Sequence, residues 1–142
     1  MIRDATLDDI PELLRMGREF YNVSGYSDLG EYNPDLLIKT IEILINSGTL
    51  LITDGGMIGW LNFPLYMTGD IVSQELFWWV DEEKRSTGIS KKLLKCAEEK
   101  SKEQGAKAMM MLCLDRLDGD RVGKMYEHFG YTPRETTYMR LH

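Results

Sequence analysis

Hydrophobic residues recur with helical spacing in four parts of the chain. In each part, apolar side chains return every three or four residues and would form one buried stripe; the segments are residues 8–21, 33–47, 88–104 and 120–129. Residues that favour helix ends flank them. Asn33-Pro34 offers a cap residue and a proline suited to the first helical position, and Gly48 follows the same segment as a stop.

Strand-like patterns account for most of the remaining chain. Two β-rich runs, 49–53 and 57–63, are joined by Asp54-Gly55-Gly56, which predicts a hairpin. Further strands are expected at residues 1–6, 71–80, 108–114 and 135–141. The run Ala108–Leu114 is apolar without alternation, so we expect it in the middle of the sheet. Residues 22–32 are polar and predict a mobile loop.

The order of these segments predicts one three-layer α/β/α domain over residues 1–142, with a mixed sheet. A helix lies between the strands 71–80 and 108–114, which makes those two strands parallel. The hairpin makes its own two strands antiparallel. Because ligands of such sheets bind at the carboxyl ends of parallel strands, residues 80–90 are the first place to look for a functional site.

Composition and charge exclude several classes of protein. The chain has 142 residues, 43% of them hydrophobic, and a net charge of −6, so it lacks the excess of basic residues that nucleic-acid binding requires. Its longest apolar run, Ala108–Leu114, is far shorter than the about 20 residues of a membrane span. The N-terminus turns acidic where a secretory signal would turn apolar. We expect no nucleic-acid partner, no membrane contact and a cytoplasmic protein.

Cysteine and histidine offer no metal chemistry. Cys96 and Cys113 form no C-x-x-C pair, and His128 and His142 have no further ligand at metal-binding spacing. We therefore expect no metal site and interpret both cysteines as buried small hydrophobic residues.

The start of the third predicted helix has the features of an anion site. Residues 86–90 are mostly small, and the free backbone N–H groups of a helix start point at a common spot together with the positive end of the helix dipole. Residues 84–102 hold seven cations and two acids in a chain that is acidic overall. This acidic chain thus concentrates its cations around one helix start.

Two motifs in the chain resemble the GNAT family of N-acetyltransferases. The family's acyl-CoA motif is [Q/R]-x-x-G-x-[G/A] after a strand that ends in valine. Here Val80 is followed by Arg85-Ser86-Thr87-Gly88-Ile89-Ser90, with serine in place of the last glycine or alanine. The second motif is a helical tyrosine, Tyr126, shortly before the pair Gly130-Tyr131.

The order of elements also resembles the family over nearly the whole chain. Two further departures are Gly119, where the family often has asparagine, and a single short strand after Tyr131. These two departures concern the acceptor side of the family's site more than its cofactor side.

The resemblance implies an acetyl-CoA-dependent N-acetyltransferase. In such an enzyme, a primary amine of a small molecule or peptide attacks the thioester directly in a ternary complex. The two parallel strands would be splayed around acyl-CoA, with its diphosphate on the backbone of residues 85–90 and the thioester oxygen near Trp78 or Trp79. The implied cofactor-binding residues are Trp78, Trp79, Val80, Lys84, Arg85, Ser86, Thr87, Gly88, Ile89 and Ser90.

Catalytic and acceptor-binding residues follow from the same comparison. Tyr126 is the candidate acid, because a phenol with a pKa near 10 stays protonated at neutral pH and can donate to the departing thiolate. Glu75 is the candidate base, acting through a water, and Asp115 and Glu31 compete for that role. The acceptor pocket is expected between residues 22–32, residues 65–70 and the final strand, with three side chains binding the amine, namely Tyr26, Glu31 and Tyr32.

Two other functions stay open at this point. The chain could be a non-catalytic module that uses the acyl-CoA site to sense the cofactor or to bind a protein. It could also acylate aminoacyl-tRNA, although the acidic balance argues against that substrate. Because members of the family are often dimers, a homodimer is a further expectation.

Overall fold

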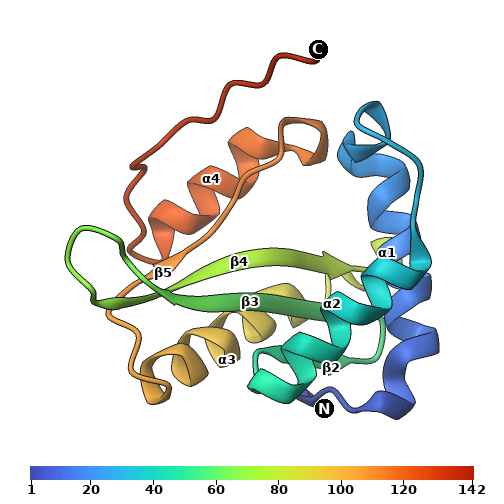
Figure 1. The fold of residues 1–142 in the computed structure, drawn as a ribbon, viewed down its shortest axis with the longest axis horizontal. Coiled ribbons are helices and arrows are strands. Elements are labelled where there is room, and N and C mark those ends of the chain that lie inside the picture. The colour runs from blue at the N-terminus through green and yellow to red at the C-terminus, as the bar shows by residue number, and fades with distance from the viewer.

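The computed structural model describes residues 1–142 as a five-stranded sheet with two helices on each face (Figure 1). The strands are β1 (Arg3–Asp4), β2 (Leu50–Thr53), β3 (Gly56–Pro64), β4 (Ile71–Val80) and β5 (Met109–Met110). The longer helices are α1 (Ile10–Ser24), α2 (Pro34–Ser47), α3 (Ile89–Glu103) and α4 (Gly119–His128). Four single turns of 3-10 helix span Leu7–Asp9, Tyr26–Asp28, Glu82–Lys84 and Asp115–Leu117.

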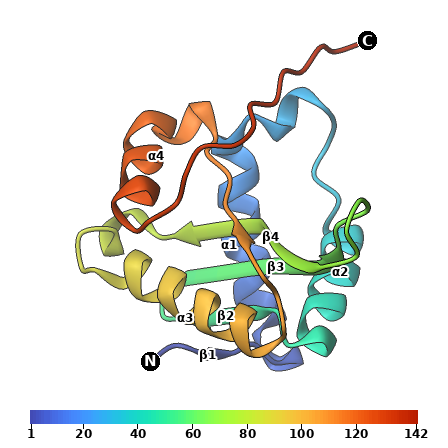
Figure 2. The same cartoon turned by 90° about the vertical axis from the view of Figure 1, so that its left-hand side faces the viewer.

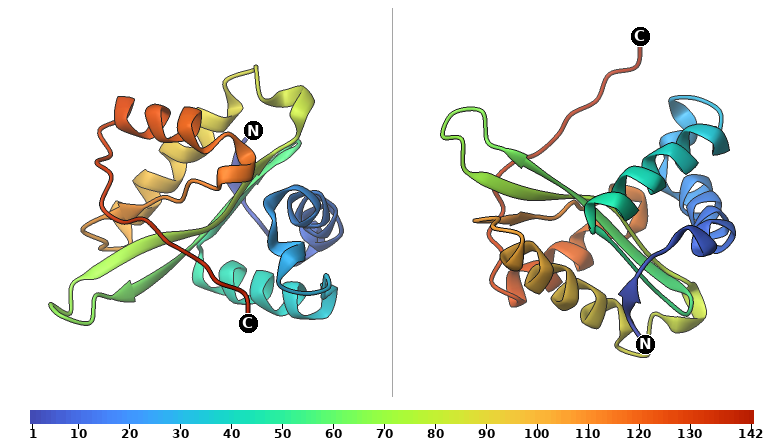
Figure 3. Two further views of the ribbon diagram at one scale, coloured as in Figure 1. Left: turned by 90° about the horizontal axis from the view of Figure 1, so that it is seen from above. Right: turned by 60° about the horizontal axis from the view of Figure 1, so that its bottom comes forward.

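The sheet has the order β1-β2-β3-β4-β5, and only its last pair of strands, β4 and β5, is parallel. Helices α1 and α2 cover one face, and α3 and α4 cover the other (Figure 3). The predicted three-layer α/β/α fold with a mixed, mostly antiparallel sheet is therefore confirmed.

Local signals place several helix ends correctly. The Asn33 side chain accepts a hydrogen bond from the Leu36 N–H (3.1 Å), Pro34 opens α2, and Gly48 closes it in the left-handed conformation. Helix α1 runs to Ser24, and residues 26–28 add a 3-10 turn. The segment predicted as a mobile loop is therefore partly helical.

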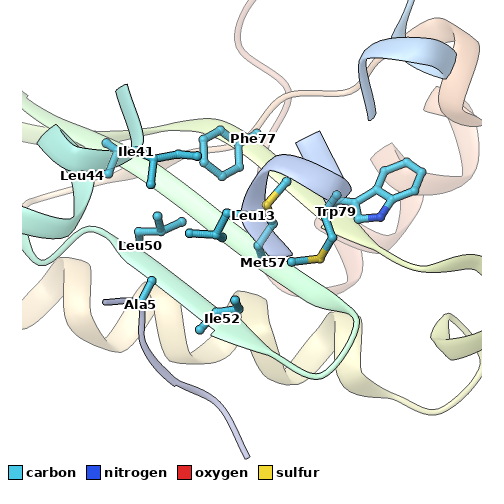
Figure 4. Close-up of a cluster of buried hydrophobic side chains, with 10 residues drawn as sticks. Ala5, Leu13, Ile41, Leu44, Leu50, Ile52, Met57, Phe77 and Trp79 are labelled. Carbon is cyan, nitrogen blue, oxygen red and sulfur yellow. The ribbon is translucent and has the colours of Figure 1, made fainter. Parts of the chain in front are cut away.

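Each face of the sheet has its own hydrophobic core. On the α1 and α2 side, Leu13 and Leu44 pack with Phe77 and Trp79 of β4 (Figure 4). On the α3 and α4 side, the fully buried Trp60 packs in a second cluster whose other buried members include Leu93, Leu94, Ala97 and Tyr126. Strand β4 contributes to both cores, so its side chains connect the two sides of the molecule.

A β-bulge interrupts β4 at Leu76. Gly59 of β3 pairs with Phe77, whereas the next residue, Trp60, pairs with Glu75, so that Leu76 is the extra residue. The bulge changes which side chains face which side: Glu75 reaches towards α4, while Leu76 and Phe77 both pack towards α1 and α2. Bulges of this kind re-aim side chains next to functional sites.

Two strand predictions are wrong. Only Met109 and Met110 of the run 108–114 form a strand, and β5 lies at the edge of the sheet rather than in its middle. Residues 131–142 form no strand, and residues 132–142 are exposed along an extended course (Figure 2). Because β5 pairs over two residues only, the alternating segment 135–141 has no long strand edge to pair with.

The short β5 also corrects the interpretation of the cysteines. Cys113 follows the strand and is exposed, and Cys96 on α3 is half-buried.

No helix in the structure combines the length and the apolar composition needed to cross a membrane.

Candidate functional site

The parallel strands stop pairing in the middle of β4. Ser73 pairs with Met109 and Gln74 with Met110, and no backbone hydrogen bond joins residues 76–80 to residues 111–114. At the point of separation, the Leu112 N–H donates to the Glu75 carboxylate (3.0 Å) instead of to a strand carbonyl. The second half of β4 therefore has backbone groups on its β5 side that are free for a ligand.

Glu75 is a buried carboxyl group at this separation. Only 7% of the residue is exposed, and its burial raises its pKa to about 7, against the opposing effect of the hydrogen bond from the Leu112 N–H. The two competing candidates for the base, Asp115 and Glu31, are exposed. Of the three carboxyl groups, Glu75 is the one that is buried.

Tyr126 binds the backbone of the same residue, Leu112. Its hydroxyl donates to the Leu112 carbonyl (2.9 Å), so the backbone of this one residue binds both Tyr126 and Glu75. Burial of the phenol, followed by the nearby charge of Glu75, raises the pKa of Tyr126 above its usual value. The structure thus brings together the two residues predicted as acid and base.

Aromatic rings surround the Tyr126 side chain. The ring centres of Trp78 and Tyr131 lie 6.0 and 5.5 Å from that of Tyr126. The indole Nε1 of Trp78 is buried and has no hydrogen-bond partner. Because a buried donor is costly without a partner, this N–H is suited to bind a group of a ligand.

Helix α3 begins without a side-chain cap. Gly88, directly before the helix, has φ +82°, and a Cβ atom built there would meet no atom within 4 Å. The first N–H groups of α3 have no partner within the helix. Ser86, Thr87 and Gly88 are exposed, so the helix start is open to an anion such as a diphosphate.

Lys84 and Arg85, the two cations predicted to lie beside this helix start, both form contacts with other residues of the chain. Lys84 forms an ion pair with Asp54 in the β2–β3 turn. The Arg85 Nε donates to the Val80 carbonyl (2.8 Å), and its guanidinium group lies 4.8 Å from the ring centre of Trp79. These contacts hold the loop 81–88 in place, and they leave the backbone N–H groups as the main partners for an anion.

A chain of contacts connects this loop to α1. The Trp79 Nε1 donates to the Asp81 carboxylate (2.9 Å), and Arg15 of α1 forms an ion pair with the same carboxylate (2.7 Å). Arg15 and Asp81 are not among the residues that the sequence predicted for the site. The one available signal was Asp81 itself, a carboxylate directly after the apolar end of a strand.

Lys91 and Lys95 on α3 differ from Lys84, because neither has a carboxylate within ion-pair distance. Their amino groups lie 5.9 and 5.7 Å from the ring centre of Phe129. Lys91 stands in the first turn of α3 and adds a positive charge beside the free N–H groups.

A cavity of about 570 Å³ lies on the opposite face of the sheet, between α1, α2 and the bulge of β4. The three residues predicted to bind the acceptor, Tyr26, Glu31 and Tyr32, all line it, and Leu76 and Phe77 of the bulge contribute to its wall. The pKa of Tyr26 is raised by burial and, to a lesser extent, by the charge of Glu75, whose carboxylate lies on the other side of the sheet.

The other two predicted borders of the acceptor pocket are wrong. Residues 65–70 form the turn before β4, at its opposite end, and do not line the cavity, and the final strand does not form. Leu36 and Leu37 of α2 line it instead. Leu36 follows the apolar spacing of the buried stripe of this helix, yet it is 60% exposed in the structure, so the sequence pattern did not mark it as a cavity residue.

Replacing Gly88 with alanine tests the diphosphate site that the resemblance implies. The binding of acetyl-CoA, the ligand expected there, should weaken several-fold, because φ +82° costs an L-residue about 1–2 kcal/mol although the space is open. Gly69→Ala is the matched control: Gly69 also has a positive φ (+77°) and no neighbour within 4 Å, but it lies in the turn before β4. Isothermal titration of acetyl-CoA into both variants measures the two affinities. Equal losses of affinity in the two variants would contradict a diphosphate site at Gly88.

Comparison with known proteins adds a family match. The family model described as acetyltransferase (GNAT) family matches residues 14–131. No curated protein matches the chain. The matched range contains the bulge of β4, the start of α3, and both Glu75 and Tyr126.

Solved structures match over nearly the whole chain. A ribosomal-protein-alanine N-acetyltransferase from Brucella melitensis biovar Abortus 2308 has a TM-score of 0.72 at 18% identity, with 100% of this chain and 99% of that chain covered. An aminoglycoside acetyltransferase from an uncultured soil metagenomic sample has a TM-score of 0.71 at 18% identity (100% and 94% covered). A transcriptional regulator from Bacillus halodurans has a TM-score of 0.73 at 19% identity (99% of each). These likenesses show the fold.

Proposed function

Since the chain belongs to the GNAT acetyltransferase family, we propose that it is an acetyl-CoA-dependent N-acetyltransferase acting on a primary amine of a small molecule or peptide. The observation that carries the proposal is the burial of Glu75 and Tyr126 side by side where β4 and β5 stop pairing. A carboxyl group and a phenol at such a position provide a base for the amine and an acid for the leaving thiolate.

The chain's free polar groups are suited to acetyl-CoA. The open start of α3 matches a diphosphate, the unpaired backbone of β4 matches an amide-containing arm, and the Trp78 Nε1 offers a further donor. Val80 and residues 84–90 would hold the nucleotide end, and Trp78 and Trp79 the acyl end. When bound, acetyl-CoA supplies an acetyl group activated as a thioester.

Glu75 is suited to remove the proton of the attacking amine. An alkylammonium group has a pKa near 10.4, and an ordinary glutamate, with a pKa of about 4.3, lies about six units below it. With a pKa of about 7, Glu75 narrows this difference to about three units and is still largely ionised at slightly alkaline pH.

The protonation of Glu75 also affects Tyr126. The Glu75 charge helps to raise the pKa of the phenol, so the phenol is a poor proton donor while the carboxylate is ionised. Once Glu75 has taken a proton, this charge is gone, and Tyr126 becomes a better donor towards a thiolate. The effect of the Glu75 charge on the Tyr126 pKa therefore favours a sequence in which Glu75 accepts a proton before Tyr126 donates one.

The amine would approach from the cavity on the α1 and α2 side. The cavity lies on the face of β4 opposite to the Glu75 carboxylate, although the charge of Glu75 helps to raise the pKa of Tyr26 in the cavity lining. The amine would therefore reach Glu75 through the gap beside residues 76–80 of β4, where no backbone hydrogen bond joins β4 to residues 111–114. A cofactor along this half of β4 would meet the amine in the same gap, which is the arrangement that direct attack in a ternary complex needs.

Acetyl-CoA is expected to raise the melting temperature of the protein in a thermal-shift series, and a screen of primary amines is expected to release free thiol from it. A matched series with desulfo-CoA, which has no sulfur and cannot carry an acetyl group, reports binding without the thioester. Binding without thiol release for any amine would favour the non-catalytic sensor instead. Absence of any thermal shift would reject the acyl-CoA site and the proposed function with it.

A further inference from the structure

We infer that the acceptor is a hydrophobic primary monoamine, in which one amino group is carried on an aromatic or branched aliphatic body. This inference rests on the proposed function, because it names the substrate class of the same site. It is carried by the walls and polar groups of the cavity between α1, α2 and the β4 bulge.

The walls of the cavity are predominantly apolar and contain five aromatic side chains, those of Phe20, Tyr21, Tyr26, Tyr32 and Phe77. Its volume of about 570 Å³ falls within the usual range of about 300–1,000 Å³ for small-molecule sites. Aromatic faces bind both apolar bodies and ammonium groups, the latter through cation–π attraction. The shape and lining are therefore suited to a compact apolar molecule with a single cationic end.

Charge in the lining is limited to one group. Glu31 is the only charged side chain that lines the cavity, and it has no ion pair within the chain. One carboxylate can compensate one ammonium group. A polyamine would bring further cations into an apolar site without a partner, and burying an unpaired charge is strongly unfavourable.

Most polar groups of the lining are already engaged. The Tyr21 hydroxyl donates to the Gly30 carbonyl (2.6 Å), the Tyr32 hydroxyl to the Leu14 carbonyl (3.4 Å), and the Thr40 hydroxyl to the Leu36 carbonyl (3.2 Å). The Tyr26 hydroxyl makes no hydrogen bond within the chain. An aminosugar, with many hydroxyl groups, would find few partners here and would lose its hydration.

The rim of the cavity exposes apolar surface that an apolar ligand would cover. Leu29 is 59% exposed, Leu36 60% and Tyr26 38%, and all three line the same cavity. Contiguous exposed apolar side chains are typical of ligand-binding grooves.

Initial rates of thiol release test the inference, with phenethylamine and isopentylamine compared with spermidine and kanamycin. We expect kcat/KM for the two hydrophobic amines to exceed that for the two polycations by tenfold or more. A higher kcat/KM for spermidine or kanamycin would overturn the inference and leave the proposed function intact.

A matched pair of variants on α2 makes the test specific to the cavity. Leu36→Asn is expected to raise the KM for phenethylamine by about tenfold with the KM for acetyl-CoA unchanged, since one lost apolar contact is worth at least that much in a hydrophobic pocket. Ile43→Asn is the control, because Ile43 is equally exposed (58%) on the same helix and does not line the cavity. Equal KM values in both variants would overturn the inference.

Calorimetric titration of phenethylamine without acetyl-CoA separates the inference from the function. Binding that weakens in Leu36→Asn and persists in Ile43→Asn supports the substrate class even where no thiol is released, and that result counts against the proposed function alone. Failure of phenethylamine to bind and to react, while spermidine or kanamycin does either, contradicts the substrate class alone.

Discussion

Replacing Glu75 with glutamine is expected to lower kcat by about 10²- to 10⁴-fold, the usual contribution of a positioned base. In the parent protein, the rate should rise with pH through about 7, because Glu75 must lose its proton before it can accept one from the amine. The variant should lack this rise. The measurement is kcat and kcat/KM as a function of pH between about 5 and 9, with a saturating amine.

The two competing carboxyl groups provide the controls. Asp115→Asn and Glu31→Gln each remove an exposed carboxylate, and both variants should keep the pH-dependent rise in kcat. Glu31→Gln is expected to raise the KM of the amine, because Glu31 lines the acceptor cavity. A Glu75→Gln enzyme with the parental pH profile would remove Glu75 from the mechanism, and loss of the rise in Asp115→Asn would transfer the role to Asp115.

Stability gives a second measure of the same substitution. The pKa of Glu75 is raised from 4.5 to about 7 by folding, so the native state holds an extra proton between these values, and stability falls as pH increases through that window. Above pH 7 the ionised carboxylate costs about 3 kcal/mol. Glutamine carries no such charge and can still accept from the Leu112 N–H. Urea unfolding should therefore find the variant more stable than the parent at pH 8 and similar at pH 4.

The parts of the fold that depend on neighbours in sequence are those that the sequence predicted well. Asn33 and Gly48 mark the two ends of α2 through contacts within a few residues, and α3 begins at Ile89, one residue after the predicted start. Such helix ends need only local geometry, which the chain encodes residue by residue. Tyr126 was instead proposed from the motif shared with the GNAT family, and Glu75 from its place in the strand predicted at residues 71–80; their catalytic roles stay predictions.

The failures depend on distant partners. The run 108–114 is apolar enough for a central strand, yet its pairing with β4 ends where the Glu75 side chain takes the place of a strand carbonyl. Residues 135–141 alternate between apolar and polar side chains as a strand does, but a strand forms only when it can pair with the edge of a neighbouring strand. Nothing in the residues around Leu76 marks the bulge, because it is a property of the register between β3 and β4.

The lining of the cavity, too, could be predicted from the sequence only where its residues are neighbours in the chain. Tyr26, Glu31 and Tyr32 were recognised as a group because they lie close together in the sequence. Their apolar counterparts, Leu36 and Leu76, come from α2 and from the bulge, and only the fold brings them together. A cationic ligand could therefore be predicted from the sequence, whereas the apolar character of the site could not.

Replacing Tyr126 with phenylalanine is expected to lower kcat by about 10²- to 10⁴-fold with the affinity for acetyl-CoA nearly unchanged. The substitution removes one hydroxyl and keeps the ring that packs against Trp78 and Tyr131. The lost hydrogen bond to the Leu112 carbonyl costs about 1 kcal/mol of stability, which a folded protein of this size tolerates. Steady-state rates and a calorimetric titration of acetyl-CoA measure the two quantities on the same preparation.

Tyr131→Phe separates chemistry from packing. Tyr131 lies beside Tyr126, its pKa is raised by burial and by Glu98, and its hydroxyl donates to the Glu98 carboxylate (2.7 Å), so its loss removes a comparable hydrogen bond. This hydroxyl is bound to α3 rather than to the Leu112 backbone that Glu75 shares. We therefore expect Tyr131→Phe to keep most of kcat. A Tyr126→Phe enzyme as active as Tyr131→Phe would show that the thiolate takes its proton from water or from another group.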